Sequence, residues 1–480
     1  MPYDAPPSTP DRGAADPALM TAAELRALYA RGALSPVEAL QATLERVARL
    51  NPRVNAFAVL NPRALDAAGE SEQRWRAGHP LGPLDGVPCT VKDLVDLAGF
   101  PTRRGSRATS PAPVRDDAPV SAALKRAGAV ILGKTTTTEF GWKTPGDCPL
   151  HGITRNPWNL AHTPGGSSSG AGAAGAAGFG PLHVGTDAGG SIRIPAAWCG
   201  LVGLKPSFGR VPQWPLGAFG AVACAGPVAR TSEDCALMLG ALAQHDDRDP
   251  YSLPDQPRDW TAGLDRGVRG LRVGVLRRPG FDAPVDRDGI AAVERAAAIL
   301  GDAGAELEEA APDLPDTRAV FGRLWAVALA ALAGGMDEER RLLLDEGLRR
   351  VAAGAAEATA ADMLAVEALR LQAAHAMARL HRAFDLVLCP AVPGPPPLAG
   401  AQPEDPAAAL WQDWAPWTAL FNLTRQPAAA VPMGVGPRGL PRSVQLAAAL
   451  YRDDLVLRAA RVLERAEPLP AAPLSPGAPA

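Results

Sequence analysis

Lysine is scarce in this sequence. Of the 48 basic residues in the 480-residue chain, only Lys92, Lys125, Lys134, Lys143 and Lys205 are lysine, and the other 43 are arginine. A guanidinium stays protonated near neutral pH, whereas a lysine amine in a suitable environment can lose its proton. Each of the five lysines is therefore a candidate for a role that arginine cannot fill.

Long apolar segments and strong net charge are also missing. The longest apolar run, Leu324 to Met336, is too short to cross a bilayer, and the N-terminal segment has no apolar core of a secretory signal. A formal net charge of −3 gives no electrostatic reason to expect nucleic acid or an anionic membrane as a partner. We therefore expect a cytoplasmic protein that binds neither.

The cysteines show no paired spacing. The six are scattered, with no C-x-x-C pair and no histidine at ligand spacing. Reduced, mostly buried thiols in the cytoplasm fit this pattern best. We accordingly expect no disulfide framework, no metal and no organic cofactor.

No repeat and no shift in composition divides the chain. Its hydrophobic content of 47% and charged content of 21% are ordinary for a globular protein, and its length is enough to bury a large core. We predict a single α/β domain over residues 19–468. The flanking segments 1–18 and 469–480 are expected to be flexible.

Local signals predict several elements. Thr21 and Ser35 stand at the starts of two predicted helices within residues 21–50, and Pro36 suits a first helical position. The apolar segment "CTVKDLV" at 89–95 predicts a strand, and residues 120–141 predict a helix that stops at Gly128 and is followed by a strand. Further along the chain we predict mainly helices over 287–383, a strand at 384–392 and a helix at 453–466.

The stretch "TPGGSSSGAGAAGAAG", residues 163–178, matches three motifs. Residues 166–170 fit G-x-S-x-G, the nucleophile elbow of serine hydrolases. Residues 170–175 fit G-x-G-x-x-G, the dinucleotide-binding fingerprint. A third interpretation makes the stretch one half of a serine/lysine site. The surrounding sequence has to decide between them.

The context disfavours the first two motifs. Residues 163–166 make a poor strand because proline cannot donate to a ladder and two glycines weaken it, and an elbow needs a strand there. The downstream His375 and His381 lie in helical runs typical of surface or packing residues. No strand runs into Gly170, and Asp187 is early for a ribose-binding acid. We interpret the Gly/Ala tract as a small-residue helix packed closely against its neighbours.

The third interpretation includes two further residues, Lys92 upstream of Ser167 and Ser191 downstream of it. With these positions the sequence resembles the amidase signature family from about residue 20 to 465. The matching segments, in the family's order, are "LDGVPCTVKDLVDLAG", "GAVILGKTTTTEFGW", "HGITRNPWNLAHTPGGSSSG", "GTDAGGSIRIPAAWCGLVGLKPSFGRV", "GPVART" and "FNLTRQPAAAVPMG".

This resemblance implies a fold with a mixed central β-sheet covered by helices on both faces. It also implies a Ser–Ser–Lys triad, with Ser191 as the nucleophile, Ser167 as the bridging serine and Lys92 as the base. In the family the peptide bond before the bridging serine is cis. Asp187 and Arg193 would hold the nucleophile loop by hydrogen bonds.

The chemistry suits these residue types. Serine is a weak nucleophile whose proton must be removed during attack, and a free lysine, with a pKa of about 10.4, is protonated at pH 7. Burial lowers the pKa of a lysine, and the apolar segment around Lys92 favours burial. Asp93 would oppose this, but side chains alternate on a strand, so we expect Asp93 to point away.

The turn "DAGGS" favours an oxyanion hole. Gly189 and Gly190 have no side chains, so backbone N–H groups from Ala188 to Ser191 can converge on one point and stabilise a tetrahedral intermediate. We expect Ser168 to help orient Ser167.

The other lysines receive structural predictions. Lys134 and Lys205 lie in matching segments and are interpreted as residues that fix loops, whereas Lys125 and Lys143 are interpreted as surface charges. Arg425 is a candidate either to bind an acid group of the substrate or to form a surface ion pair, and we predict the ion pair.

Aromatic residues suggest a pocket whose substrate the sequence does not identify. Trp142 and Trp214 are candidates to line it, and the trio Trp411, Trp414 and Trp417 has the spacing of one helical face, which is more often core packing.

The resemblance implies hydrolysis of a small-molecule amide through an acyl-enzyme on Ser191, without cofactor, and a homodimer by family likeness. The alternative on the same fold is the glutaminase subunit of a tRNA-dependent amidotransferase, which works with partner chains. A dinucleotide-binding module is the non-enzymatic alternative; it would show saturable cofactor binding.

Overall fold

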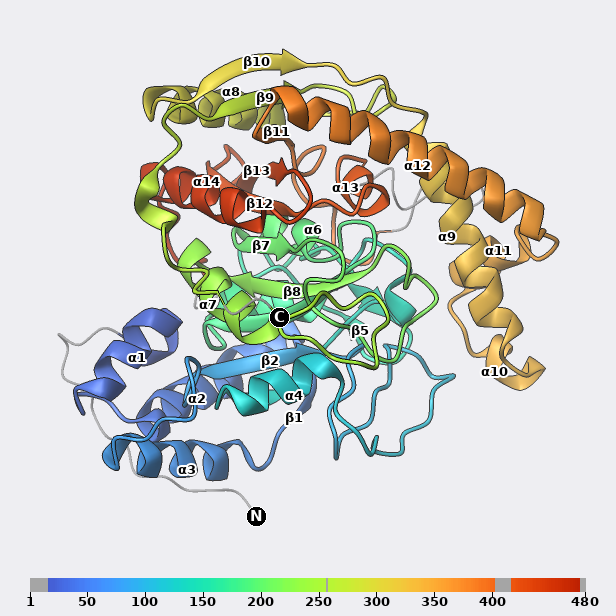
Figure 1. Cartoon of the computed structure of the whole chain (residues 1–480). Helices are drawn as coiled ribbons and strands as arrows, with labels where there is room; N and C mark the ends of the chain where they lie inside the picture. The colour runs from blue at the N-terminus through green and yellow to red at the C-terminus, as the bar shows by residue number, and fades with distance from the viewer. Residues whose placement is uncertain (1–15, 256–257, 402–415, 475–480) are drawn as a thin grey trace.

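The computed structural model describes residues 16–255, 258–401 and 416–474. Eleven strands of these segments form one sheet in the order β1-β3-β2-β6-β8-β7-β12-β13-β11-β9-β10 (Figure 1). Their bounds are β1 Phe57–Leu60, β2 Pro88–Lys92, β3 Val130–Thr135, β6 Leu182–Asp187, β7 Val202–Lys205, β8 Cys224–Ala229, β9 Arg272–Leu276, β10 Glu306–Ala310, β11 Leu386–Pro390, β12 Ala428–Val435 and β13 Pro441–Ala448. A separate pair consists of β4 Asp147–Cys148 and β5 Gly152–Ile153.

The sheet is mixed, as predicted. Strand β2 runs parallel to both of its neighbours, β3 and β6, and β9 runs parallel to β10 and β11. The strands between these two groups pair antiparallel. Because β2 and β6 are parallel neighbours, their carboxyl ends lie at the same edge of the sheet.

Helices pack on both faces of the sheet, which confirms the predicted α/β class. On β12, Ala429 and Val431 lie in the largest apolar cluster, whereas Ala430 between them lies in the cluster of Trp198. Alternate strand residues point to opposite faces, so the two clusters mark the two sides of the sheet. The first side carries α4 (Pro119–Arg126), α7 (Ser232–Leu242), α8 (Arg287–Asp302) and α14 (Asp453–Ala466), and the second carries α5 (Ser169–Ala177) and α6 (Arg193–Cys199).

The first helices begin where the sequence predicts. In α1 (Ala22–Ala30) the Thr21 hydroxyl accepts from the Glu24 N–H, and in α2 (Pro36–Val54) Ser35 does the same for Glu38. Both glutamate carboxylates accept a hydrogen bond from the backbone N–H of the cap residue, which completes two capping boxes. Helix α3 (Ala64–Arg76) follows β1.

The Gly/Ala tract forms the closely packed helix α5, whose residues are all buried. A Cβ added at Gly172 would lie 2.8 Å from the Pro195 side chain, and one at Gly175 would lie 2.8 Å from Leu201. Even the methyl group of an alanine would therefore force a neighbouring side chain to shift at these positions. No strand leads into Gly170, so the context needed for a dinucleotide fingerprint is absent from this described segment.

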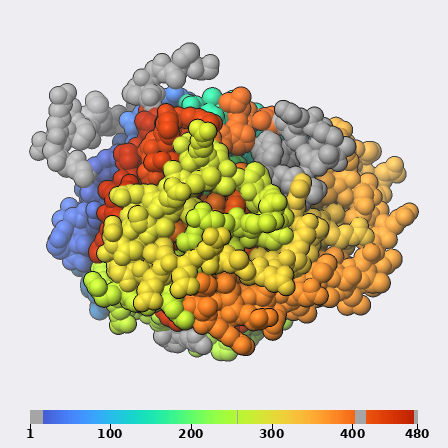
Figure 2. All heavy atoms as spheres, turned by 90° about the horizontal axis from the view of Figure 1, so that it is seen from above, coloured from blue at the N-terminus to red at the C-terminus, as the bar shows by residue number. Residues whose placement is uncertain are grey.

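The segment after residue 272 differs in part from the prediction. Helices α9 (Thr317–Gly334), α10 (Glu338–Leu342), α11 (Glu346–Ala353) and α12 (Ala360–Ala383) follow α8, but β10 interrupts the expected helical run. The sequence "ELEEA" has no apolar alternation because β10 lies at the edge of the sheet and is mostly exposed. Figure 2 shows the yellow and orange part of the chain covering much of the upper face of the molecule.

Among the described helices, α9 alone is long and apolar enough for a membrane span, judged by length and composition. Core helices of globular proteins pass the same test. One side of α9 packs in the apolar cluster around Phe321 and Trp325, against α11 and α13 (Ala419–Leu423).

The described part of the predicted C-terminal tail packs on the domain. Leu469 and Ala472 contact the cluster around Trp198, and Leu474 contacts a cluster that includes Phe179. The rest of this tail, and residues 1–15 of the predicted N-terminal segment, lie outside the described residues.

Candidate active site

Lys92 and Thr186 meet because β2 and β6 are parallel neighbours with their ends at one edge. The Nζ atom of Lys92 lies 2.9 Å from Thr186 Oγ1 and 2.7 Å from Ser167 Oγ. Ser167 reaches this point from the loop before α5, and the peptide bond between Gly166 and Ser167 is cis, as the family resemblance implies. The structure thus brings two of the three predicted triad residues into direct contact.

The Lys92 amine is completely buried. Desolvation lowers its pKa well below the ordinary value, and the negative charge of Asp187 offsets part of that shift. The hydroxyls of Ser167 and Thr186 surround the amine without adding a contacting carboxylate. This environment favours a neutral amine that can accept a proton.

Asp93 points away from Lys92, as expected, but strand alternation is not the reason, because β2 ends at Lys92 and Asp93 lies in the turn that follows. Its carboxylate lies 2.8 Å from the Nζ atom of Lys134, and both side chains are buried. Lys134 Nζ also donates to the Pro101 carbonyl and to Thr102 Oγ1. Lys134 therefore fixes the loop after β2, which agrees with its predicted structural role.

Ser191 lies in the loop between β6 and α6 and is 9% exposed. The carboxylate of Asp187 organises this loop: it accepts from the Gly190 N–H at 2.7 Å and from the Ile192 N–H at 3.1 Å. Arg193 Nε donates to the same carboxylate at 2.9 Å. Asp187 and Arg193 therefore hold this loop by hydrogen bonds, as the family resemblance implies.

The contact of Gly190 corrects one sequence prediction. Its N–H is engaged by Asp187 Oδ1 and is not available to an oxyanion in this structure. The N–H groups of Ala188, Gly189 and Ser191 have no acceptor among the described residues. An oxyanion hole in this loop would consist of these three groups.

Ser168 also differs from the prediction. Its hydroxyl donates to the Thr186 carbonyl at 3.2 Å and does not contact Ser167. Its backbone N–H donates to the carbonyl of Ser191 at 3.2 Å. Ser168 therefore links the nucleophile loop to the end of β6.

Several residues at the site escaped the sequence analysis. Thr418 Oγ1 donates to the Gly189 carbonyl at 2.6 Å, and Asn422 Nδ2 donates to Asp187 Oδ1 at 2.9 Å. Arg193 donates to Gln445 Oε1 at 2.6 Å. Thr186, beside Lys92, is the fourth. Thr418, Asn422 and Gln445 come from segments far downstream of the loop in the chain. Asn422 lies in the matching segment "FNLTRQPAAAVPMG", but no local pattern assigns any of the three to the loop.

Replacing Arg193 with alanine is expected to reduce the free energy of unfolding by about 3–5 kcal/mol. The reason is that Arg193 and Asp187 form a fully buried ion pair with a 2.9 Å contact, so the variant would leave the Asp187 carboxylate without its charge partner. Urea unfolding at pH 7 measures the loss. Arg350→Ala, which removes an exposed pair with Glu346, serves as the matched control and should change it by less than about 1 kcal/mol.

The pH dependence of the free energy of unfolding provides a second readout of the Arg193–Asp187 pair. Arg193 holds the pKa of Asp187 below its ordinary value, although burial alone would raise it. The stabilisation is therefore present above the unfolded-state pKa of about 3.9 and is lost as the pH falls further into the acid range. If Arg193→Ala lost no more free energy of unfolding at pH 7 than Arg350→Ala, this account would be contradicted.

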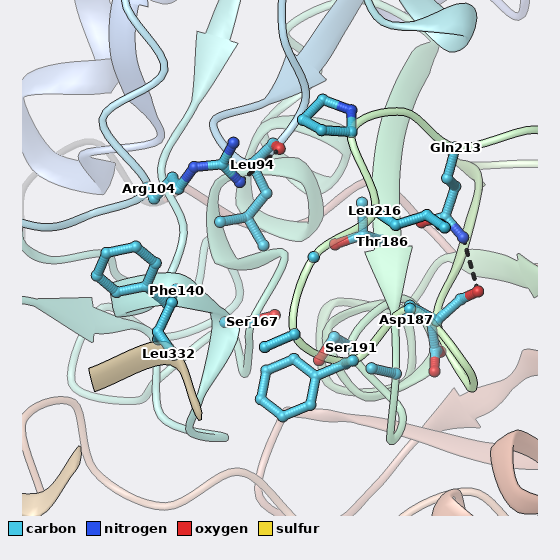
Figure 3. A pocket seen from close by; sticks show the side chains of 18 residues that line it. Leu94, Arg104, Phe140, Ser167, Thr186, Asp187, Ser191, Gln213, Leu216 and Leu332 are labelled. Carbon is cyan, nitrogen blue, oxygen red and sulfur yellow. Dashed lines mark hydrogen bonds between the residues drawn. The ribbon is translucent and has the colours of Figure 1, made fainter. Parts of the chain in front are cut away.

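Ser167 and Ser191 both line a cavity of about 330 Å³. Figure 3 shows them between Phe140 and Leu332 on one side and Gln213 and Leu216 on the other. The other lining residues are Leu94, Arg104, Gly141, Thr186, Asp187, Ala188, Pro215, Gly217, Ala218, Phe219, Gly220, Ala223. The nucleophile loop thus opens onto a mainly apolar chamber.

Of the predicted tryptophans, the three that the structure describes do not line this cavity. Trp142 lines a separate space of about 30 Å³ that also touches Ser191, and Trp214 is exposed. Trp417 is buried in the core, as its spacing suggested, whereas Trp411 and Trp414 lie outside the described residues. The aromatic walls come from Phe140 and Phe219, and the latter stacks on Trp325 of α9.

Two further predictions for charged residues need correction. Lys143 is buried and forms ion pairs with Asp147 at 2.6 Å and Asp345 at 3.2 Å, because the segment after β3 is covered by the start of α11. Arg425 lies over the Phe208 ring at 4.2 Å and donates to the Ala221 carbonyl.

The remaining two lysines behave as expected. Lys125 is partly exposed and pairs with Asp117, and the buried Lys205 donates to the Pro206 carbonyl. Within the described ranges, no three His, Cys, Asp or Glu side chains are placed to hold a metal ion. That neither a metal nor an organic cofactor takes part stays a prediction.

Comparisons with known proteins show which family the chain matches. The family model "Amidase" matches residues 38–457. An acylamidase from Rhodococcus erythropolis is 36% identical over 458 residues, covering 94% of this chain and 96% of its own. A glutamyl-tRNA(Gln) amidotransferase subunit from Roseiflexus castenholzii is also 36% identical, covering 93% and 95%. The crystal structure of a bacterial aryl acylamidase of the amidase signature enzymes superposes with a TM-score of 0.87 at 30% identity, covering 94% and 96%.

Proposed function

This chain belongs to the amidase signature family and is an amidohydrolase, and we propose that it cleaves amides with Ser191 as nucleophile, Ser167 as proton relay and Lys92 as base. One observation carries the assignment: a buried amine with a lowered pKa contacts the hydroxyl of Ser167, and Ser167 and Ser191 line the same cavity.

In the first half-reaction, the Ser191 oxygen bonds to the amide carbonyl carbon. Its proton passes to Ser167, whose own proton passes to Lys92. The N–H groups of Ala188, Gly189 and Ser191 donate to the oxyanion that forms. When the C–N bond breaks, Lys92 returns the proton through Ser167 to the leaving nitrogen. Ammonia or an amine departs and the acyl group stays on Ser191.

The second half-reaction uses the same groups with water. Lys92 accepts a proton from water through Ser167 while the water oxygen bonds to the acyl carbon. Collapse of this intermediate breaks the ester bond, and the proton returns to the Ser191 oxygen. The carboxylic acid leaves, and the enzyme is restored without a cofactor.

The alternative is a glutaminase subunit, which the amidotransferase relative keeps open because it is as similar as the acylamidase. Glutamine carries an α-ammonium group that needs an acceptor. Among the described residues that line the cavity, Asp187 has the only carboxylate, and Gly190, Ile192 and Arg193 occupy it. This favours an enzyme that works by itself on amides other than glutamine.

Ammonia release by the purified chain alone tests the proposal. The substrates are hexanamide, benzamide and glutamine, at equal concentration. We expect release from the first two and little from glutamine. Release from glutamine alone, or only after addition of a partner chain, would instead support the amidotransferase function.

We further propose a cytoplasmic homodimer. The six cysteines are all unpaired and buried, which suits a reducing compartment, and the dimer rests on family likeness. Light scattering of the purified chain would measure its mass in solution.

A further inference from the structure

Arg104 is the one cationic side chain among the described residues that line the cavity. The only other charged lining group is Asp187, which is already bound to the nucleophile loop and to Arg193. Every other described lining residue is apolar, glycine or an uncharged polar residue. Within the cavity, the described residues therefore offer Arg104 no free anionic partner.

The backbone of Arg104 is held in an unusual conformation. Its φ of +52° lies in the left-handed region, which a residue other than glycine rarely adopts. The Arg104 N–H donates to the Asp93 carbonyl at 3.1 Å, and its carbonyl accepts from the Phe140 N–H at 2.8 Å. These two bonds tie it to the residue after Lys92 and to a cavity wall. Strained residues of this kind cluster at functional sites.

The guanidinium itself is held only loosely. Its contacts are the Leu94 carbonyl at 3.4 Å and the Asp96 carboxylate at 3.7 Å, and the side chain is 29% exposed. Arg193, by contrast, makes contacts of 2.9 Å or less to Asp187 and Gln445. Arg104 therefore keeps donors for a further acceptor. Figure 3 shows its guanidinium above Leu94, on the opposite side of Leu94 from Ser167.

The cavity that Arg104 and Ser191 share has large apolar walls. The large apolar side chains that line it are Leu94, Phe140, Leu216, Phe219 and Leu332. An alkyl or aryl group gains from burial there, at about 25 cal/mol per Å² of apolar surface removed from water. A guanidinium matches a carboxylate by two parallel hydrogen bonds, which is the strongest form of this contact.

We propose that Arg104 selects the substrate, and that this substrate is an amide with an apolar middle and a carboxylate at the end far from the scissile bond. The inference rests on the proposed function, since it concerns the same cavity. The amide carbon lies at Ser191, the apolar segment crosses the chamber, and the carboxylate pairs with Arg104. An α-ammonium group has no free acceptor on this path.

A homologous series of probes tests the proposal. The acids HOOC–(CH2)n–CONH2, with n from 2 to 6, and 4-carboxybenzamide are compared with methyl-terminated amides of equal length and with benzamide. We expect kcat/KM to be higher for the acids by about 10- to 100-fold at the best chain length, the range expected for a charge-assisted hydrogen bond. The value of n at the maximum measures the span from Ser191 to Arg104.

Arg104→Ala should lower the ratio of kcat/KM for the acids to kcat/KM for the matched neutral amides to about 1, as expected when only a remote contact is lost. Arg104→Lys should retain part of the preference, because an ammonium cannot form the two parallel bonds. Arg103→Ala is the matched control: its neighbouring guanidinium donates to Thr109 Oγ1 and does not line the cavity.

The outcomes separate the two proposals. Equal rates for acids and neutral amides in the wild type, or an unchanged preference in Arg104→Ala, would overturn the role of Arg104 while the amidase function stands. No hydrolysis of any compound by the wild type would overturn both.

Discussion

Ser191→Ala is expected to lower kcat for amide hydrolysis by a factor on the order of 10⁴ to 10⁶. Removing the nucleophile removes the acyl-enzyme route altogether. The residual rate would come from the oxyanion hole and from substrate binding, which the substitution leaves in place. The free energy of unfolding should change by less than about 1 kcal/mol, because Ser191 is a small loop residue whose hydroxyl has no hydrogen-bond partner among the described residues.

Kinetics and mass spectrometry check this result together. Ammonia release is measured with hexanamide at saturating concentration, and the wild type is quenched during turnover to find a peptide containing Ser191 with the mass of the acyl group. Ser169→Ala is the matched control, since Ser169 is buried in the same serine-rich stretch and its hydroxyl contacts only the Ser167 carbonyl at 3.4 Å. A rate for Ser191→Ala equal to that of the control would show that the nucleophile lies elsewhere.

Lys92→Arg is expected to lower kcat/KM by a factor on the order of 10² to 10⁴ while a positive charge is retained. The guanidinium cannot give up its proton, so it cannot accept one from Ser167. Lys92→Met should lower kcat/KM by a similar factor, because its side chain has no amine to accept the proton. Lys134→Arg, at the other buried lysine beside β2, is the control, because Lys134 pairs with Asp93 and does not contact either serine.

The pH dependence of the wild type should carry the signature of Lys92. Burial lowers its pKa, so the neutral, active form predominates from a pH well below the ordinary value of about 10.4 upward. The rate therefore rises with pH through the lowered pKa and then levels off. Because the unfolded chain binds this proton more tightly than the folded protein, stability also rises with pH up to about 10.4.

A profile of kcat/KM from pH 5 to 10 locates this rising limb, since kcat/KM reports the pKa of the free enzyme. The limb should be absent from the residual activity of Lys92→Met and unchanged in Lys134→Arg. If Lys92→Arg kept activity within 10-fold of wild type with the same limb, another group would be the base.

Residue-level signals in the sequence were sufficient where the physical cause is local. The capping boxes of Thr21 and Ser35 satisfy backbone groups close by in the chain, so they could be identified without knowledge of the fold. The closely packed helix α5 follows in the same way from a run of glycine and alanine. The weak pattern of β10 could not be recognised, because an exposed edge strand has little reason to alternate apolar and polar residues.

The sequence by itself determined which residues are chemically able to act: few lysines, one of them in an apolar segment, and two serines at matching positions in a family pattern. Only the tertiary structure decided how they are arranged. Parallel pairing of β2 with β6 brings Lys92 to Thr186, and packing between segments far apart in the chain supplies Thr418, Asn422 and Gln445. Hydrogen-bond partners, burial and cavity walls depend on contacts between distant segments, and no local spacing encodes which N–H group, such as that of Gly190, is already occupied.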